Sequence, residues 1–284
     1  MTRLCSRSRR GFTLVELLVV LFVCVFLLAM FPACYTRQER GSNRVKCASN
    51  LRQIGQAILL YSNDNAGAYP RTRATAGRVV TPTWGTGASA TNPFNADGPE
   101  PNDVTAALFL LLRTQDITAE VFTCPSSNAE RDPATFTGAG TTTQPTIGPS
   151  NFHDVKKNLS YSYQNPYPND GAVERKWHLD NAIPAEYAVA ADMNPGTTGD
   201  GHNVLAVTVK SSNQQMKQGN SANHDGDGQN VLYGDGHVEW QMNPFVGVER
   251  DNIYTVSDGK GGNAQALLDS PYDLKDSILL PTDD

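Results

Sequence analysis

The chain has 284 residues and a formal net charge of −6, with 39% apolar and 18% charged residues. This composition excludes a wholly disordered tail and a polybasic nucleic-acid-binding protein, so no nucleic-acid partner is expected. Glycine and proline contribute 24 and 17 residues, which predicts many turns rather than an all-helical bundle.

An apolar segment follows four arginines near the N-terminus. It covers residues 12–34 and is interrupted only by Thr13, Glu16 and Pro32. A helix of this length rises about 35 Å, which is enough to cross a bilayer. We therefore expect a transmembrane helix over residues 12–34.

Three interpretations of this segment are open. An ordinary secretory signal has a charged start and an apolar core, but the small-x-small cleavage site is missing. A lipoprotein signal would use Cys34, although Phe31 and Pro32 fit poorly the residue pattern that precedes the cysteine in such signals. The third interpretation starts from Glu16, because a carboxylate within an apolar helix requires a reason.

Residues 9–34 resemble the start of type IV prepilins and pseudopilins, which share a basic leader, a glycine, Phe-Thr-Leu-x-Glu and an apolar helix. The resemblance implies that residues 1–11 are a leader. A membrane-embedded prepilin peptidase would cut between Gly11 and Phe12 and methylate the new amino terminus. A carboxylate in apolar surroundings needs a cationic partner, and the amine of a neighbouring subunit supplies one only in register, so Glu16 is expected to direct assembly.

An amphipathic helix is predicted beyond the apolar segment, over residues 35–65. Apolar side chains recur there at spacings of four and three, which places them on one helix face. These positions are Cys47, Leu51, Ile54, Ile58 and Tyr61. Such a stripe is typical of a helix that packs on a sheet, and it agrees with the architecture of pilins.

The remaining residues, 66–284, are predicted to form a head of mixed structure. One helix is expected from the candidate N-cap Asp103 to about Arg113. Candidate strands are short and separated by long polar connections, and they cover residues 120–124, 159–164, 187–192, 204–209, 231–233 and 237–241. The predicted fold class is α+β and pilin-like: a long N-terminal membrane and amphipathic helix packs on a mainly antiparallel β head with long loops.

The five cysteines fall into different parts of the predicted molecule. Cys5, Cys24 and Cys34 belong to the leader and the apolar segment, which leaves Cys47 and Cys124 in the exported part. A disulfide between these two would stabilise the head by about 4 kcal/mol in the chain-entropy model. Two buried free thiols are the alternative, because the sequence gives no distance between them.

The head also resembles a large group of pilin-like proteins abundant in planctomycete-type bacteria. The segments that carry this resemblance are residues 47–61, 69–70, 122–126 and 230–238. The group has an H-x9-DG motif near its C-terminus, and here ten residues separate His224 from Asp235 and Gly236, one more than in the motif. The resemblance implies membership of the group and no particular biochemical activity.

A β-hairpin is predicted over residues 230–241, with residues 234–236 in its turn. Asp235 is interpreted as a turn residue. Upstream, Asp225 and Asp227 form part of a calcium-loop pattern, but the spaced glutamate that completes an EF-hand is missing. Calcium is therefore the one candidate cofactor, and a polar turn without metal is the favoured alternative.

Histidines and carboxylates gather in the last third of the chain without forming a recognisable catalytic motif. The histidines concerned are His202, His224 and His237. Isolated exposed histidines are more often solvated loop residues than catalysts, so no enzymatic activity is expected.

The expected function is that of a structural subunit in a type IV pilus-like or type II secretion pseudopilus-like filament. Its expected partners are prepilin peptidase, other pilin or pseudopilin subunits and the bacterial inner membrane, with the head in the periplasm or in an extracellular filament. The alternative is a membrane-anchored recognition protein of carbohydrate-binding type. In that case Trp84, Trp177 and Trp240 would present their rings, although all three are equally compatible with a core.

Overall fold

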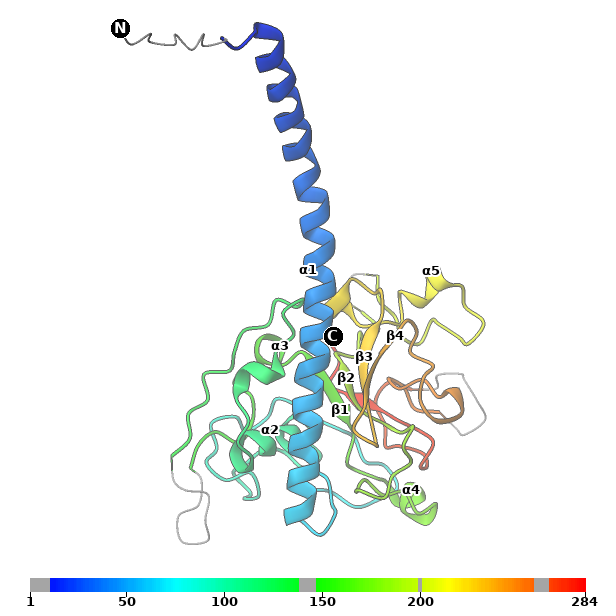
Figure 1. Cartoon of the computed structure of the whole chain (residues 1–284). Coiled ribbons are helices and arrows are strands. Elements are labelled where there is room, and N and C mark those ends of the chain that lie inside the picture. Colours follow the sequence, from blue (N-terminus) through cyan, green and yellow to red (C-terminus); the bar gives the residue numbers. More distant parts are fainter. Residues whose placement is uncertain (1–10, 138–146, 199–200, 258–265) are drawn as a thin grey trace, which may run out of the picture. The chain divides into compact units, whose positions relative to one another are not determined.

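The computed structural model describes residues 11–137, 147–198, 201–257 and 266–284, and for residues 29–40 it describes the backbone alone (Figure 1). The predicted leader, apart from Gly11, and the side chain of Cys34 therefore lie outside the described residues. Internal contacts divide the chain into two units, residues 1–42 and 43–284. Helix α1 (Leu14–Asp64) begins in the first unit and ends in the second, so its two parts are described separately.

The N-terminal unit contains the first part of α1. Its large apolar side chains between Phe12 and Leu28 are between 48% and 77% exposed. Within the described ranges, no helix combines the length and the apolar character needed to cross a membrane. The transmembrane helix predicted over residues 12–34 is therefore not confirmed.

In the head, residues 43–64 of α1 turn the predicted apolar stripe toward the core. Cys47, Leu51 and Ile54 are fully buried, and Ile58 and Tyr61 are 1% and 9% exposed. The amphipathic helix is confirmed for this part. The buried face of the helix follows from the spacings of four and three, because these spacings keep apolar side chains on one face of a helix with 3.6 residues per turn.

A five-stranded antiparallel sheet, in the order β4-β3-β2-β1-β5, forms the centre of the head (Figure 1). Its strands are β1 (Tyr161–Gln164), β2 (Ala188–Asp192), β3 (Gln229–Tyr233), β4 (Val238–Gln241) and β5 (Leu279–Leu280). Four of the predicted strands are confirmed, and β5 was not predicted. The α+β class is confirmed as well.

Two predicted strands are wrong. In place of a strand at 120–124, the chain forms the 3₁₀ helix η1 (Ala119–Phe122), where the adjacent residues Val121 and Phe122 are both buried. A strand with one buried face would bury alternate residues instead. In the segment 204–209, which contains no strand, Val204 and Val207 are buried three residues apart and belong to two different apolar clusters.

Helix α2 (Val104–Thr114) confirms the helix predicted after Asp103. The Asp103 carboxylate caps it, because Oδ1 accepts a hydrogen bond from Ala106 N at 2.8 Å. Short helical turns occupy the connections elsewhere: α3 (Val155–Asn158), α4 (Asp170–Glu174), α5 (Asn213–Met216), η2 (Ala222–His224) and η3 (Val248–Arg250).

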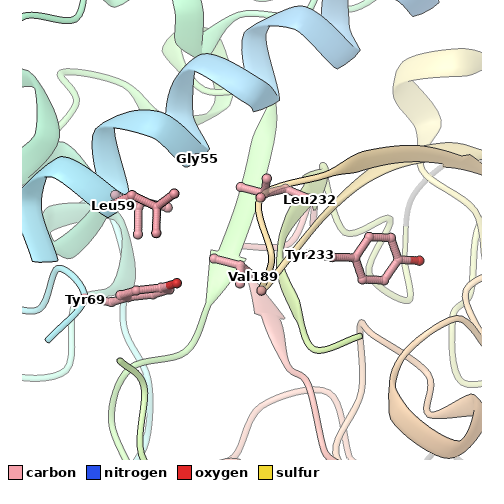
Figure 2. Close-up of a pocket in the computed structure, with 9 residues that line it drawn as sticks. Gly55, Leu59, Tyr69, Val189, Leu232 and Tyr233 are labelled. Atoms are coloured by element: carbon pink, nitrogen blue, oxygen red, sulfur yellow. The ribbon is translucent and has the colours of Figure 1, made fainter. Parts of the chain in front are cut away.

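Helix α1 approaches the β3–β4 hairpin closely at Gly55 (Figure 2). A Cβ atom at Gly55 would lie 2.8 Å from Cδ1 of Leu232, so only glycine allows this approach without a shift of the neighbour. The cavity beside it, lined in part by Leu59, Tyr69 and Val189, has a volume of about 10 Å³. This volume holds at most one water molecule, so this face is a packed helix–sheet contact rather than a ligand pocket.

Candidate functional site

The residues predicted for processing precede α1 in an exposed, non-helical segment. Gly11 is exposed and Phe12 is 76% exposed, which leaves the peptide bond between them accessible. A Cβ atom at Gly11 would have no neighbour within 4 Å. The fold of the described residues therefore gives no reason for glycine at this position.

Thr13 and Glu16 form a capping box at the start of α1. Both N and Oγ1 of Thr13 donate hydrogen bonds to Glu16 Oε2 at 2.8 Å, and Glu16 N donates to Thr13 Oγ1 at 3.3 Å. This reciprocal arrangement satisfies amide hydrogens that a helix start leaves free. Glu16 thus has a local structural role, which the Thr-x-x-Glu spacing signals and which the sequence analysis missed.

A second candidate site surrounds the disulfide in the head. Cys47 on α1 and Cys124 after η1 are bonded, as predicted, across a sequence separation of 77 residues. The Nε2 atom of His224 lies 3.7 Å from Cys124 Sγ and 3.3 Å from Asp192 Oδ2. The four side chains come from four separate segments and meet in the core. We call them the Cys-Cys-Asp-His cluster.

Asp192 ends strand β2 and is fully buried. Its Oδ2 atom accepts hydrogen bonds from Asn230 N at 2.7 Å and from Asn230 Nδ2 at 3.2 Å. Its Oδ1 atom has no hydrogen-bond partner among the residues that the structure describes. A buried carboxylate needs compensating charge or hydrogen bonds, and Asn230 supplies these to one oxygen only.

His224 was expected to be an exposed loop residue, and this expectation is wrong. The residue is 8% exposed, and its ring meets the Trp240 ring edge-on with centroids 5.2 Å apart. The Arg44 guanidinium covers Trp240 at 3.5 Å from the ring centre. Because η2 ends at His224 and Asp225 takes a left-handed conformation with φ of 56°, the chain turns at this point.

The predicted hairpin is confirmed, with β3 and β4 joined by residues 234–237. Gly236 has a φ of 86°, which favours glycine. Asp235 Oδ1 accepts a hydrogen bond from His237 N at 3.0 Å, and this bond lowers the pKa of Asp235. Asp235 therefore acts as a turn residue. Of the motif residues His224, Asp235 and Gly236, only His224 belongs to the Cys-Cys-Asp-His cluster.

The loop proposed for calcium shows a different arrangement. Asp225 is exposed, and Asp227 Oδ1 forms an ion pair with Lys217 Nζ at 2.6 Å. Within the described part of the chain, the one gathering of three or more His, Cys, Asp or Glu donors is the Cys-Cys-Asp-His cluster. Calcium binding by Asp225 and Asp227 stays a prediction.

Comparison with known families adds one finding at the N-terminus. Residues 6–31 match the family model of the prokaryotic N-terminal methylation motif. The chain carries a prepilin-type signal. No curated protein and no solved structure matches the chain.

The prepilin-type signal includes the predicted processing and assembly residues. Gly11, Phe12 and Glu16 all lie within the matched residues 6–31, whereas the Cys-Cys-Asp-His cluster lies outside them. The signal fits processing by a prepilin peptidase and assembly with pilin subunits. It also fits a protein that is anchored in a membrane or assembled into a filament.

Proposed function

We propose that this chain is a structural subunit of a type IV pilus-like or type II secretion pseudopilus-like filament. The observation that carries the proposal is the match of residues 6–31 to the N-terminal methylation motif. The start of α1 supports it, because the helix begins at Leu14, the third residue after the proposed cleavage position between Gly11 and Phe12.

Assembly accounts for the apolar surface of the N-terminal unit. Side chains between Phe12 and Leu28 are between 48% and 77% exposed, and a soluble monomer rarely leaves so large an apolar surface in water. In the proposal, this part of α1 is held in the bacterial inner membrane before assembly and lies against other subunits afterwards. The head then lies outside the cytoplasm, where the Cys47–Cys124 disulfide persists.

We also propose that the head belongs to the planctomycete-type group with the H-x9-DG motif. The support is the sequence pattern of His224, Asp235 and Gly236, with one residue more than the motif. The extra residue falls in a segment with its own turns, since Gly226 and Gly228 have φ of 69° and 152°. No catalytic role is proposed for these residues.

Processing is the direct test. The full-length chain is co-expressed with a prepilin peptidase, and the N-terminus of the extracted protein is analysed by mass spectrometry. We expect N-methylated Phe12 as the first residue. An intact leader, or a mature start at Cys34, would contradict the proposal.

A matched pair of glycine variants makes this test specific. A Cβ atom has no neighbour within 4 Å at either Gly11 or Gly41, so the fold tolerates a side chain at both positions. Gly11→Val is expected to abolish processing, and Gly41→Val to leave it intact. Equal processing of the two variants would show that the cleavage site lies elsewhere.

Carbohydrate recognition is the second candidate function, and Trp84 favours it. Trp84 lines an open cavity of about 360 Å³ together with His153, Asp154 and Lys156. An aromatic ring beside polar groups is typical of a small-molecule binding site. Of the other tryptophans, Trp177 is 7% exposed and donates a hydrogen bond to Tyr187, so it belongs to the core.

Binding to immobilised polysaccharides separates the two candidates. For a recognition protein, Trp84→Ala should abolish retention, and Trp240→Ala, which removes a ring already covered by Arg44, should leave it unchanged. If the unchanged protein is not retained on any polysaccharide tested, the second candidate function is wrong. The proposed filament function is unaffected by that outcome.

A further inference from the structure

The Cys-Cys-Asp-His cluster has the donor set of a zinc site. Two sulfurs, an imidazole nitrogen and a carboxylate oxygen, one from each residue, all lie within 4.8 Å of one another. Thiolate and imidazole donors in a tetrahedral arrangement select zinc over calcium or magnesium, which prefer oxygen ligands alone. We propose that the reduced head binds one Zn²⁺ through Cys47, Cys124, Asp192 and His224. This inference does not depend on the proposed filament function.

The distances within the cluster fit a tetrahedral ion. With ordinary bond lengths to zinc, a sulfur and a nitrogen ligand are about 3.6 Å apart, and a nitrogen and an oxygen ligand are about 3.4 Å apart. The measured separations are 3.7 Å from Cys124 Sγ to His224 Nε2 and 3.3 Å from that nitrogen to Asp192 Oδ2. The two sulfurs, bonded to each other here, would separate to about 3.8 Å around the ion.

The surroundings of Asp192 provide an independent observation. This carboxylate is fully buried, and its Oδ1 atom has no hydrogen-bond partner among the described residues. Both hydrogen bonds from Asn230 go to Oδ2, which fixes the orientation of the carboxylate. The ion would bind Oδ2, the oxygen 3.3 Å from His224 Nε2, and its positive charge would compensate the buried carboxylate, whose Oδ1 receives no hydrogen bond from the described residues. Fixed outer partners such as Asn230 orient metal ligands.

Burial makes this a closed structural site rather than a catalytic one. Cys47 and Asp192 are fully buried, Cys124 is 1% exposed and His224 is 8% exposed. Four protein ligands complete the tetrahedron, so no position stays open for water or substrate. The ion would join α1, the segment after η1, the end of β2 and η2.

The disulfide and the ion are alternative links between the same segments. A dithiol reductant transfers two electrons and two protons, so that the S–S bond breaks, two S–H bonds form and the dithiol becomes a disulfide. Zn²⁺ then binds both sulfurs as thiolates, and two protons pass to the solvent. The oxidised chain has no thiolates at this position and is expected to bind no zinc there.

Metal content under controlled redox conditions tests the proposal. The full-length chain, reduced with a dithiol and freed from it without air, is equilibrated with Zn²⁺, and bound zinc is measured by mass spectrometry of the element. We expect about one zinc ion per reduced chain and none per oxidised chain. In a parallel sample, Co²⁺ should give the thiolate charge-transfer and tetrahedral absorption bands. A reduced chain that binds no zinc overturns the proposal.

Variants assign the ion to this cluster. His224→Ala should weaken zinc binding by at least about 100-fold, because it removes a direct ligand, whereas loss of an outer partner costs about 10-fold to 100-fold. His237→Ala is the matched control, since His237 lies in the exposed hairpin turn. His224→Cys keeps a zinc ligand at the same position and should restore binding. If His224→Ala binds zinc as tightly as the unchanged chain, the ion lies at other cysteines and the proposal is wrong.

Discussion

His224 and Asp192 are in buried contact, with 3.3 Å between Nε2 and Oδ2, beside the Cys47–Cys124 disulfide. The side chains are 5% and 0% exposed, so solvent does not screen the contact. Removing one partner of a buried pair leaves the other group without compensation.

The first prediction follows from this contact in the oxidised protein. His224→Ala should lower the free energy of unfolding by about 3 kcal/mol, because the Asp192 carboxylate stays buried and keeps only the hydrogen bonds from Asn230. Urea unfolding of the full-length chain at neutral pH measures the change. His237→Ala, in the exposed turn, should change it by less than about 0.5 kcal/mol. Equal effects of the two variants would show that the buried contact contributes nothing.

The second prediction concerns Asp103, which connects the start of α2 to a distant loop. Its Oδ1 accepts from Ala106 N, and its Oδ2 accepts from Thr86 N at 2.9 Å and Thr86 Oγ1 at 2.7 Å. Asp103→Ala should lower the free energy of unfolding by about 3 kcal/mol. A buried carboxylate that accepts several hydrogen bonds stabilises the fold more than an ordinary N-cap does.

Asn169 offers a matched control for that prediction. It caps the short helix α4 by accepting from Ala172 N at 2.9 Å, and its side chain makes no further hydrogen bond to any described residue, unlike that of Asp103. Asn169→Ala should cost about 1 kcal/mol, as for an ordinary N-cap. Thermal unfolding of both variants gives the comparison. If Asp103→Ala costs no more than Asn169→Ala, the contacts to Thr86 do not stabilise the fold.

The third prediction is a pH dependence that arises from two buried carboxyl groups. Burial raises the pKa of Asp276 to about 7 and raises the pKa of Asp251 well above its usual value, to which the negative charge of Asp276 also contributes. When the pKa of a carboxyl group is higher in the folded state than in the unfolded state, its contribution to stability is fully present below the unfolded pKa of about 3.9. This contribution is lost as the pH rises through the folded-state pKa. The free energy of unfolding should therefore fall between about pH 4 and pH 7, by up to about 1.4 kcal/mol per pH unit for each proton.

Asp251→Asn isolates one of these two groups. The amide can still accept the hydrogen bond that Ser277 N donates to Asp251 Oδ2 at 2.8 Å, but it does not titrate. Urea unfolding between pH 4 and pH 8 should show a smaller fall in stability for this variant. Asp170→Asn, an exposed control, should leave the fall unchanged. An unchanged slope in Asp251→Asn would contradict the assignment.

The parts of the fold that the sequence predicts are those specified by neighbouring residues. The stripe from Cys47 to Tyr61 follows from helical spacing, and the cap at Asp103 follows from local chemistry. The hairpin of β3 and β4 follows from two apolar runs around a glycine-containing turn. Each of these features depends on residues that are close to one another in the sequence.

The Cys-Cys-Asp-His cluster could not be predicted in this way. Cys124 and His224 are 100 residues apart, and no spacing rule connects them to Asp192 at the end of a strand. The short strand β5 (Leu279–Leu280) pairs with β1 through two residues, too few for a period of two to be visible. At 204–209, apolar residues suggested a strand, but only Val204 and Val207 are buried, and each packs in a different apolar cluster.

The last prediction separates the two roles of Glu16, helix cap and assembly contact. Glutamine at this position can still accept the hydrogen bonds from Thr13, because capping boxes use Glu or Gln, but it carries no charge. Thr13→Ala keeps the charge and removes the hydroxyl that accepts the hydrogen bond from Glu16 N.

If a neighbouring subunit's amine pairs with the carboxylate, Glu16→Gln should reduce incorporation into sheared filaments at least about tenfold, since loss of a buried charge pair costs more than about 1.4 kcal/mol. Thr13→Ala should reduce it much less. Both variants should still be processed to Phe12, as mass spectrometry of the N-terminus will show. Normal incorporation of Glu16→Gln together with poor incorporation of Thr13→Ala would mean that Glu16 acts in assembly only through the capping box.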